Sequence, residues 1–253
     1  MDLRNAHEPQ WYVVSPRPRG EHDALQRAAN AYGAALIELS PWALRARNDD
    51  STRDALAAAL DADVVIATSI AAVRAAASLH PLHATRARWL AVGGGTAHAL
   101  HEAGVDHVET PATRLDSEGV LALPALHAEH VQRVGLVTAP GGRDALQPML
   151  RARGVEVVRA DVYERIDIDL DPSTLDRIRT LDVPAALAVS SSGALLRVLD
   201  RIDTAVRVRL TSMQVLAASA RIAGIARAHG FNDIAIATSA RPQDLLAVAR
   251  VPR

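Results

Sequence analysis

Residues 63–73 read DVVIATSIAAV, and residues 185–195 read AALAVSSSGAL. In each stretch a short apolar run comes directly before hydroxyl residues, which are followed by a second apolar segment. A buried strand that leads through Ser or Thr into a helix is typical of the βα unit, from which parallel sheets are built. We therefore predict an α/β fold.

The same alternation of short apolar runs and Ala/Leu/Arg-rich helical patterns continues along the whole chain. Four glycines stand where a helix should end and the next strand begin, namely Gly33, Gly104, Gly154 and Gly230. Glycine is favoured there because the residue after a helix often takes a left-handed backbone conformation. The strands are expected at 11–15, 35–39, 63–67, 89–93, 107–109, 134–138, 155–163, 185–190, 213–217 and 233–237.

Two kinds of strand-and-turn unit each occur twice. The first kind occurs near residue 13 and again near 136, and the second near 67 and again near 190. This order predicts that the chain starts one domain, builds a second domain, and then returns to complete the first. We expect a first domain of 1–41 plus 168–253 and a second of 48–160, with connectors at 42–47 and 161–167 and a cleft between the two parallel-sheet domains. The alternative is a tandem division near residue 130.

The two connectors have different patterns. The stretch around the first is polar and turn-rich, whereas the second alternates like an exposed strand. Tyr163 lies in the second connector and is one of three tyrosines. It fits either a half-buried strand residue or a hinge residue that faces the cleft. A phenol keeps its proton at neutral pH, so it can donate a proton or a hydrogen bond.

Composition excludes several classes of chemistry. The 253 residues contain no lysine and no cysteine, so Schiff-base, P-loop and thiolate chemistry, cysteine-ligated metals and disulfides are all absent. The net charge of -1 argues against nucleic-acid binding. No apolar run or leader of the required length is present, so we expect a cytoplasmic protein that does not bind membranes. No exposed apolar stripe is evident, which favours a monomer.

Six strand-to-helix junctions carry glycines, hydroxyl residues or both. Such residues cap helices, at about 1 kcal/mol each. Their small side chains also leave the backbone amides at the start of a helix accessible to an anion. Ligands of open α/β sheets bind at the carboxyl edge of the strands, where these junctions lie. Both interpretations stand, and the second suits a ligand with several carboxylates or phosphates. The junctions are Ser15, Thr68-Ser69, Gly93-Gly94-Gly95-Thr96, Gly141-Gly142-Arg143, Ser190-Ser191-Ser192-Gly193 and Ser219-Ala220-Arg221.

Other motifs are weaker. Gly93 and Gly95 fit the start of a dinucleotide-binding fingerprint, but His98 stands where its third glycine belongs, which leaves a nicotinamide enzyme as a minor alternative. Histidines three residues apart occur at 80 and 83, 98 and 101, and 127 and 130. No third ligand accompanies them, so we predict no metal site.

Together these segments resemble the uroporphyrinogen-III synthase family, and the resemblance spans most of the chain. The order and spacing of the segments carry it, although the start reads Ser15-Pro16-Arg17-Pro18 where the family has Thr-Arg-Pro. The segments are Arg17-Pro18, 67–73, Val92-Gly93 with Thr96-Ala97, Gly142-Arg143 with Leu146, Leu150 and Gly154, Tyr163 with Arg165, 190–192, and Ser219 with Arg221 and Gly230-Phe231.

The resemblance implies two α/β domains joined by two connecting strands, no cofactor and no metal. It implies a lyase (hydro-lyase) of haem and sirohaem biosynthesis, which closes the linear tetrapyrrole hydroxymethylbilane and inverts its last pyrrole ring through a spiro intermediate. A transient contact with the preceding enzyme of the pathway is left open.

Site residues follow from the same resemblance. Tyr163 is implied as the proton donor for departure of the substrate hydroxyl. The alternatives are a non-catalytic, hinge-closing binding protein for an anionic small molecule and a nucleotide-dependent enzyme. The residues expected to bind substrate are Arg17, Thr68, Ser69, Gly93, Thr96, Gly142, Arg143, Ser190, Ser191, Ser192, Ser219 and Arg221.

Overall fold

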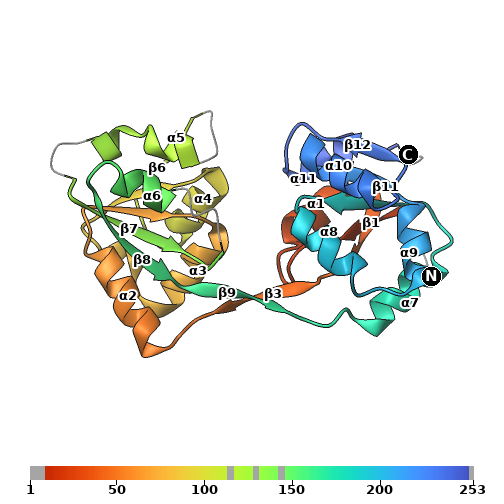
Figure 1. The fold of residues 1–253 in the computed structure, drawn as a ribbon, viewed down its shortest axis with the longest axis horizontal. Helices are drawn as coiled ribbons and strands as arrows, with labels where there is room; N and C mark the ends of the chain where they lie inside the picture. The colour runs from red at the N-terminus through yellow and green to blue at the C-terminus, as the bar shows by residue number, and fades with distance from the viewer. Residues whose placement is uncertain (1–8, 113–116, 128–130, 142–145, 251–253) are drawn as a thin grey trace, which may run out of the picture. The chain divides into compact units, whose positions relative to one another are not determined.

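The structure is a computed structural model, and it describes residues 9–112, 117–127, 131–141 and 146–250. The chain divides into two compact units (Figure 1). One unit holds Met1–Ala43 and Ile166–Arg253, and the other holds Leu44–Arg165. Among the described residues, no helix combines the length and apolar character needed to cross a lipid bilayer.

The first unit is built on a five-stranded parallel sheet in the order β12-β11-β10-β1-β2. Alternate strand residues face opposite sides, so Val13 packs toward α1 (Asp23–Ala31) and α11 (Pro242–Ala247), and Val14 packs toward four other helices. Those four are α7 (Pro172–Thr180), α8 (Ser192–Leu199), α9 (Thr204–Thr211) and α10 (Ala220–Ala228). The strands are β1 (Trp11–Ser15), β2 (Ala34–Glu38), β10 (Ala185–Val189), β11 (Gln214–Ala217) and β12 (Ile234–Ile236).

The second unit has a five-stranded parallel sheet in the order β6-β5-β4-β7-β8. One face packs on α2 (Asp50–Leu60), α3 (Ile70–Leu79), η1 (Leu82–Ala84) and α4 (Gly94–Glu102). The other face packs on α5 (Ser117–Leu121), η2 (Pro124–His127) and α6 (Leu146–Arg151). The strands are β4 (Val64–Ala67), β5 (Arg88–Ala91), β6 (Val108–Glu109), β7 (Arg133–Thr138) and β8 (Glu156–Asp161).

The two sheets share one topology. Strands β10, β11 and β12 of the first unit take the places of β4, β5 and β6 in the second, and β1 and β2 take the places of β7 and β8. These correspondences confirm the predicted repeats, because residues 13 and 136 lie on β1 and β7 while residues 67 and 190 lie at the ends of β4 and β10. The exact boundaries predicted for the two domains remain a prediction.

The connectors pair as a two-stranded sheet of β3 (Trp42–Ala46) and β9 (Tyr163–Asp167), visible as adjacent ribbons in Figure 1. The resemblance implied two connecting strands, and the pairing of β3 with β9 confirms them. The local pattern alone indicated a polar, turn-rich segment where β3 lies and one strand over 155–163, where the chain divides into β8 and β9. The division falls at Val162. Its amide donates to Thr138 O at 3.0 Å, whereas its carbonyl accepts from Arg47 N at 2.9 Å. The strand therefore changes partner there, which a local pattern does not reveal.

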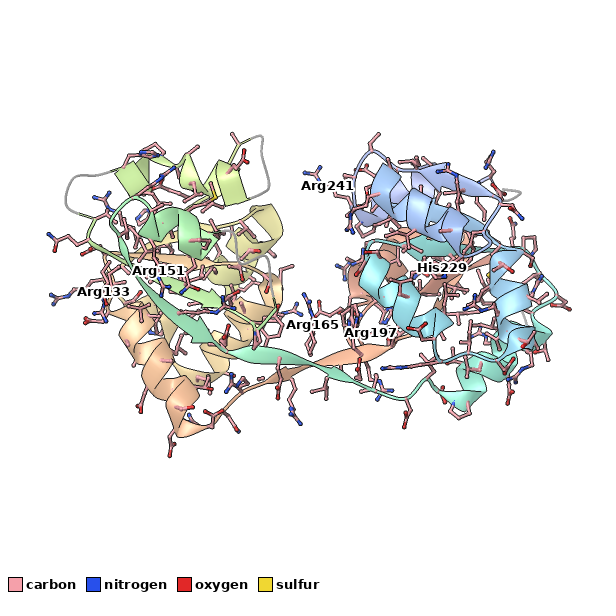
Figure 2. The ribbon with its side chains drawn as sticks, in the orientation of Figure 1. Arg133, Arg151, Arg165, Arg197, His229 and Arg241 are labelled. Carbon is pink, nitrogen blue, oxygen red and sulfur yellow. The ribbon has the colours of Figure 1, made fainter. Side chains whose placement is uncertain are left out.

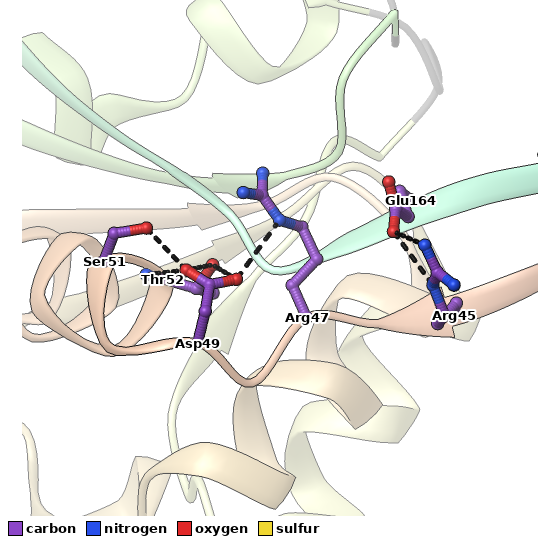
Figure 3. A network of polar contacts seen from close by, with 6 residues as sticks. All are labelled: Arg45, Arg47, Asp49, Ser51, Thr52 and Glu164. Atoms are coloured by element: carbon purple, nitrogen blue, oxygen red, sulfur yellow. Dashed lines mark hydrogen bonds and ion pairs between the residues drawn. The ribbon is translucent and has the colours of Figure 1, made fainter.

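Polar contacts hold each connector end. Arg45 Nε donates to Glu164 Oε1 at 2.9 Å across β3 and β9 (Figure 3). Asp49 caps α2 by accepting from Thr52 N at 2.9 Å. Hydrogen bonds from the Ser51 hydroxyl and from Thr52 lower the pKa of Asp49 to about 2. The first helix of the second unit therefore begins at Asp50, shortly after β3 ends at Ala46.

In the first unit, Arg197 of α8, which is labelled in Figure 2, contacts one residue of each connector. Its guanidinium lies 4.9 Å from the ring centroid of Trp42 on β3, and its Nε donates to Asp167 of β9 at 3.0 Å. Cation–π contacts of this kind contribute about 0.5–1 kcal/mol at exposed sites.

Glycine has a required role at two kinds of position. The four predicted helix-ending glycines have φ values of 71° (Gly33), 85° (Gly104), 79° (Gly154) and 92° (Gly230), which confirms that prediction. Gly135, in the middle of β7, was not singled out from the sequence. A Cβ there would lie 2.0 Å from Ala59 O, so α2 approaches the sheet more closely than any side chain would allow.

Candidate functional site

The strand order reverses at one position in each sheet, between β1 and β10 and between β7 and β4. Ligands of open parallel sheets bind outside the carboxyl ends of the strands at such a reversal. The segments that follow the two adjacent strands there lead to opposite faces of the sheet, which leaves space between them. In the first unit α1 and α8 follow these strands on opposite faces, and in the second unit α6 and α3 do so. The expected hydroxyl-bearing junctions lie at these edges.

In the second unit, hydroxyl groups meet at this reversal. Thr68, after β4, donates through Oγ1 to Thr138 Oγ1 at the end of β7, at 2.9 Å. Ser69 Oγ caps α3 by accepting from Ala72 N at 3.1 Å, and it lies 3.2 Å from Tyr163 OH. The structure thus brings together two residues expected to bind substrate, the tyrosine expected to be catalytic, and Thr138.

Tyr163 is more buried than the half-buried strand residue considered from the sequence. Its side chain belongs to the core cluster of the second unit, and the residue is 6% exposed. Its hydroxyl group reaches Ser69 at the helix end. A buried ring with its polar atom at the sheet edge holds the phenol in one place, which suits a group that must donate to a fixed point.

The junction between β5 and α4 offers backbone amides. Gly93 occupies the cap position of α4, and its carbonyl accepts from Thr96 N at 3.0 Å. Thr96 is 5% exposed, whereas Gly94 and Gly95 are exposed. The first-turn amides of a helix have no partner within the helix. Here a ligand would contact the two exposed glycines more readily than the threonine side chain.

The first unit places its serines in the same way. Ser191 Oγ caps α8 by accepting from Ala194 N, and Ser219 Oγ caps α10 by accepting from Ile222 N, both at 3.4 Å. Arg221 Nη1 donates to Ser192 Oγ at 3.2 Å and so links these neighbouring junctions. Ser190, half-buried, directly follows β10.

Arg17 follows β1, on the other side of the reversal from Ser190. Burial lowers its pKa, with Glu21 opposing that change. Within the described part of the chain, its Nε is buried and has no hydrogen-bond partner. A partly desolvated guanidinium whose Nε has no acceptor is suited to receive an anion. Gly142 and Arg143 lie outside the described residues.

The charge of the helix caps differs between the sheet edges and elsewhere. Four helices that begin at the edges, α3, α4, α8 and α10, have Ser or Gly caps and no acidic residue in the first turn. Helices α1 and α11 also begin at an edge, but their caps are His22 and Arg241 and each has an acidic residue in its first turn. Helices α2, α7 and α9 begin elsewhere, with the caps Asp49, Asp171 and Asp203. Asp caps a helix as well as Ser does and also complements the helix dipole. The neutral caps therefore leave the positive helix ends available for an anionic ligand.

His22 was not selected from the sequence. Its Nδ1 lies 3.0 Å from Ser15 Oγ and its Nε2 lies 2.8 Å from Ser40 Oγ, and the residue is 2% exposed. Burial, and secondarily the charge of Arg17, lowers the pKa of His22 to about 4. No local signal marks this residue, because its two partners come from separate strand ends.

The spaced histidines make separate contacts on α4. His98 is exposed and pairs with Glu102 at 3.5 Å, while His101 Nδ1 lies 2.8 Å from Val105 O. In the described part of the chain, no group of three or more His, Asp or Glu side chains is placed to hold a metal ion.

Comparison with known proteins agrees with this geometry. Residues 23–247 match the family described as uroporphyrinogen-III synthase HemD. The uroporphyrinogen-III synthase of Escherichia coli (strain K12) is 31% identical over 246 residues, which cover 92% of this chain and 97% of that protein. The Salmonella typhimurium synthase is also 31% identical, over 245 residues and with the same coverage.

Two solved structures share the fold. A mutant uroporphyrinogen III synthase from the extremely thermophilic bacterium Thermus thermophilus has a TM-score of 0.54 at 20% identity, covering 93% of this chain and 96% of that one. Uroporphyrinogen-III synthetase from Helicobacter pylori 26695 has a TM-score of 0.60 at 14% identity, with the same coverage. The family match over most of the chain and the 31% identity to the two synthases show that the chain belongs to the uroporphyrinogen-III synthase family.

Proposed function

We propose that this uroporphyrinogen-III synthase binds hydroxymethylbilane through the neutral helix ends and arginines of its sheet edges, and that it closes the chain with inversion of the last ring. The enzyme is a lyase of tetrapyrrole biosynthesis. The observation that carries the binding proposal is the segregation of cap charge. Four edge helices, α3, α4, α8 and α10, have Ser or Gly caps and no acidic residue in the first turn, whereas the three helices α2, α7 and α9, which begin elsewhere, have Asp caps. The edge helices α1 and α11 are exceptions, with His22 and Arg241 at the cap and an acidic residue in the first turn.

The acetate and propionate arms of the substrate require many hydrogen-bond donors. Ser191 and Ser219 each accept one amide hydrogen bond, so each hydroxyl hydrogen remains available for a carboxylate. Ser69 also accepts an amide hydrogen bond, and its oxygen lies 3.2 Å from Tyr163 OH. Arg17 and Arg221 add charge. Hydrogen bonds to charged groups contribute about 1.5–3 kcal/mol each, so distributed contacts of this kind can hold a flexible polyanion.

Tyr163 is the proposed proton donor. Transfer of its proton to the terminal hydroxyl group allows that group to leave as water, and the pyrrole electrons form the azafulvene. The substituted carbon of the last ring then attacks, which gives the spiro intermediate, and the released ring rejoins in inverted orientation. The protein contributes mainly position, an effect worth about 7–11 kcal/mol in favourable intramolecular cases.

An isomer assay tests the reaction. The purified chain is incubated, without added cofactor, with freshly generated hydroxymethylbilane, and the products are oxidised and separated. Excess type III isomer over the spontaneous type I product is expected, with heat-inactivated chain as the control. Type I product alone would contradict the proposal.

We also propose that the enzyme is a monomer in the cytoplasm, as its sequence predicts. Sedimentation at assay concentration should give a mass near 26.9 kDa. Cell fractionation should place it with the soluble cytoplasmic enzymes. A dimer mass or membrane recovery would contradict the respective proposal.

A further inference from the structure

His22 joins three segments of the first unit. It occupies the cap position before α1, but its ring does not cap that helix. Instead, Nδ1 lies 3.0 Å from Ser15 at the end of β1, and Nε2 lies 2.8 Å from Ser40 between β2 and β3. Ser15 is 0% exposed and Ser40 is 9% exposed. The imidazole is therefore a buried bridge at the carboxyl edge of the sheet.

The bridge closes the base of the loop that carries Arg17. The loop begins at Ser15 and ends at His22, so the bond between these two side chains joins its ends. Two backbone bonds hold its middle: Glu21 N donates to Pro18 O at 3.0 Å, and Arg19 N donates to Trp42 O of β3 at 2.9 Å. The conformation of the loop is thus held by the contact between His22 and Ser15 at its ends and by the backbone bond to β3.

A neutral imidazole suits this position. One ring nitrogen donates and the other accepts, and each serine hydroxyl can take either role. The charged groups around the ring are Arg17, Asp23 and Glu38, whose Oε2 lies 3.7 Å from Nε2. A neutral ring adds no positive charge beside the guanidinium of Arg17. That guanidinium can therefore stay close to the ring and receive an incoming anion.

We infer that His22 is a positioning residue for substrate binding: by bridging Ser15 and Ser40 it fixes the loop so that Arg17 meets a substrate carboxylate without having to be ordered first. The inference rests on the proposed function. Preorganisation of this kind strengthens binding because the entropic cost of ordering is met during folding. It predicts an effect on KM rather than on kcat, since Arg17 contacts a carboxylate and not the reacting carbons.

Two variants of His22 each remove one of its two contacts with serine and retain the other. In His22→Asn the amide nitrogen replaces Nδ1, which retains the contact with Ser15 and loses the one with Ser40. In His22→Gln the amide nitrogen replaces Nε2, which retains Ser40 and loses Ser15. Because the Ser15 contact closes the loop, His22→Gln should raise KM about tenfold. His22→Asn should raise it less, and kcat should change less than about twofold in both.

A double variant tests whether His22 acts through Arg17. Arg17→Gln alone should raise KM by about tenfold or more, because a charged hydrogen bond is lost. Adding His22→Gln to Arg17→Gln should then change KM little, since the guanidinium that His22 is inferred to position is no longer present. His101→Gln is the matched control. It removes the contact of His101, on α4, with Val105 O and should leave KM unchanged.

The outcomes distinguish this inference from the proposed function. An active wild type with unchanged KM in His22→Gln, or with full additivity in the double variant, overturns the inference alone. A wild type that yields only type I product overturns the proposed function and this inference with it. Thermal unfolding of each variant shows whether it is folded, and Ser15→Ala, which removes the same contact from the other side, should reproduce the KM of His22→Gln.

Discussion

Ser69 and Ser191 show that capping and ligand binding are compatible at a single residue. Each oxygen accepts a hydrogen bond from its own helix, at 3.1 Å and 3.4 Å respectively. The hydroxyl hydrogen is not used by that bond and can point toward a ligand. Ser69 has the further neighbour Tyr163. The two interpretations considered from the sequence therefore do not exclude each other.

Replacement of Tyr163 by Phe tests the proposed proton donor. The variant loses only the hydroxyl group near Ser69, so we expect turnover to fall by on the order of 10²-fold, typical of a lost general acid. Stability should fall by about 1 kcal/mol for one hydrogen bond. Steady-state kinetics and thermal unfolding measure these quantities.

Tyr12→Phe is the control, since the Tyr12 ring lies under Arg177 at 4.7 Å and the ring itself is kept. Its turnover should equal that of wild type. Unchanged turnover in Tyr163→Phe would remove the assignment of the proton donor.

His22 also predicts how stability depends on pH. Its pKa is lowered from 6.5 to about 4, so between these values the unfolded chain binds a proton that the folded chain does not. The free energy of unfolding is therefore undiminished by this group above pH 6.5. It falls by up to about 3 kcal/mol as the pH decreases from 6.5 toward 4.

Urea unfolding at several pH values measures this dependence. The free energy of unfolding of His22→Asn should fall less between pH 6.5 and 4 than that of wild type, because Asn does not titrate there. Parallel curves for the two proteins would contradict the assignment.

At the scale of the element, helix α8 tests whether a neutral cap serves an anion. Ser191→Asp keeps a good cap and complements the helix dipole, so stability should be equal or up to about 1 kcal/mol higher. The added carboxylate should repel substrate and raise KM about tenfold, less so at high salt.

The matched control is Asp171→Ser on α7, which exchanges the same two residue types at a helix end away from the sheet edges. It should leave KM unchanged. An unchanged KM in Ser191→Asp would show that this helix end does not meet the substrate.

Helix α2 and strand β7 test the close approach at Gly135. Because a Cβ at that position would lie 2.0 Å from Ala59 O, Gly135→Ala requires the helix to move, which should cost about 3 kcal/mol. Gly224→Ala on α10 meets nothing within 4 Å and should stabilise by about 0.5–1 kcal/mol. Chemical denaturation of both variants checks the contrast, and equal stabilities would contradict the packing described.

At the scale of the whole molecule, each unit has its own core. Two apolar clusters of the second unit lie entirely within Leu44–Arg165. One of them includes the buried residues Val162 and Tyr163. We propose that this unit is an independently folding domain, so the fragment 44–165 should unfold cooperatively. The fragment 48–160, with the boundaries predicted from the sequence, lacks the two buried residues and should be less stable by about 2 kcal/mol or more. Circular dichroism during heating compares them, and a fragment 44–165 without a cooperative transition would refute independent folding.

The amino-acid sequence alone determined the features that depend on neighbours along the chain. Alternating apolar runs and helical patterns predicted the α/β class, the repeats predicted matching sheets, and Gly33 and Gly230 marked helix ends. Serine caps could be recognised because a cap and the amide it bonds are three residues apart.

Tertiary structure decided the contacts between distant segments. Tyr163 meets Ser69 across 94 positions and Thr68 meets Thr138 across 70, so no local pattern encodes either pair. His22 became a candidate positioning residue only when two strand ends brought serines to both ring nitrogens. The physical reason is that propensity and capping act through nearby backbone, whereas burial and side-chain hydrogen bonds at a sheet edge exist only after the strands have paired.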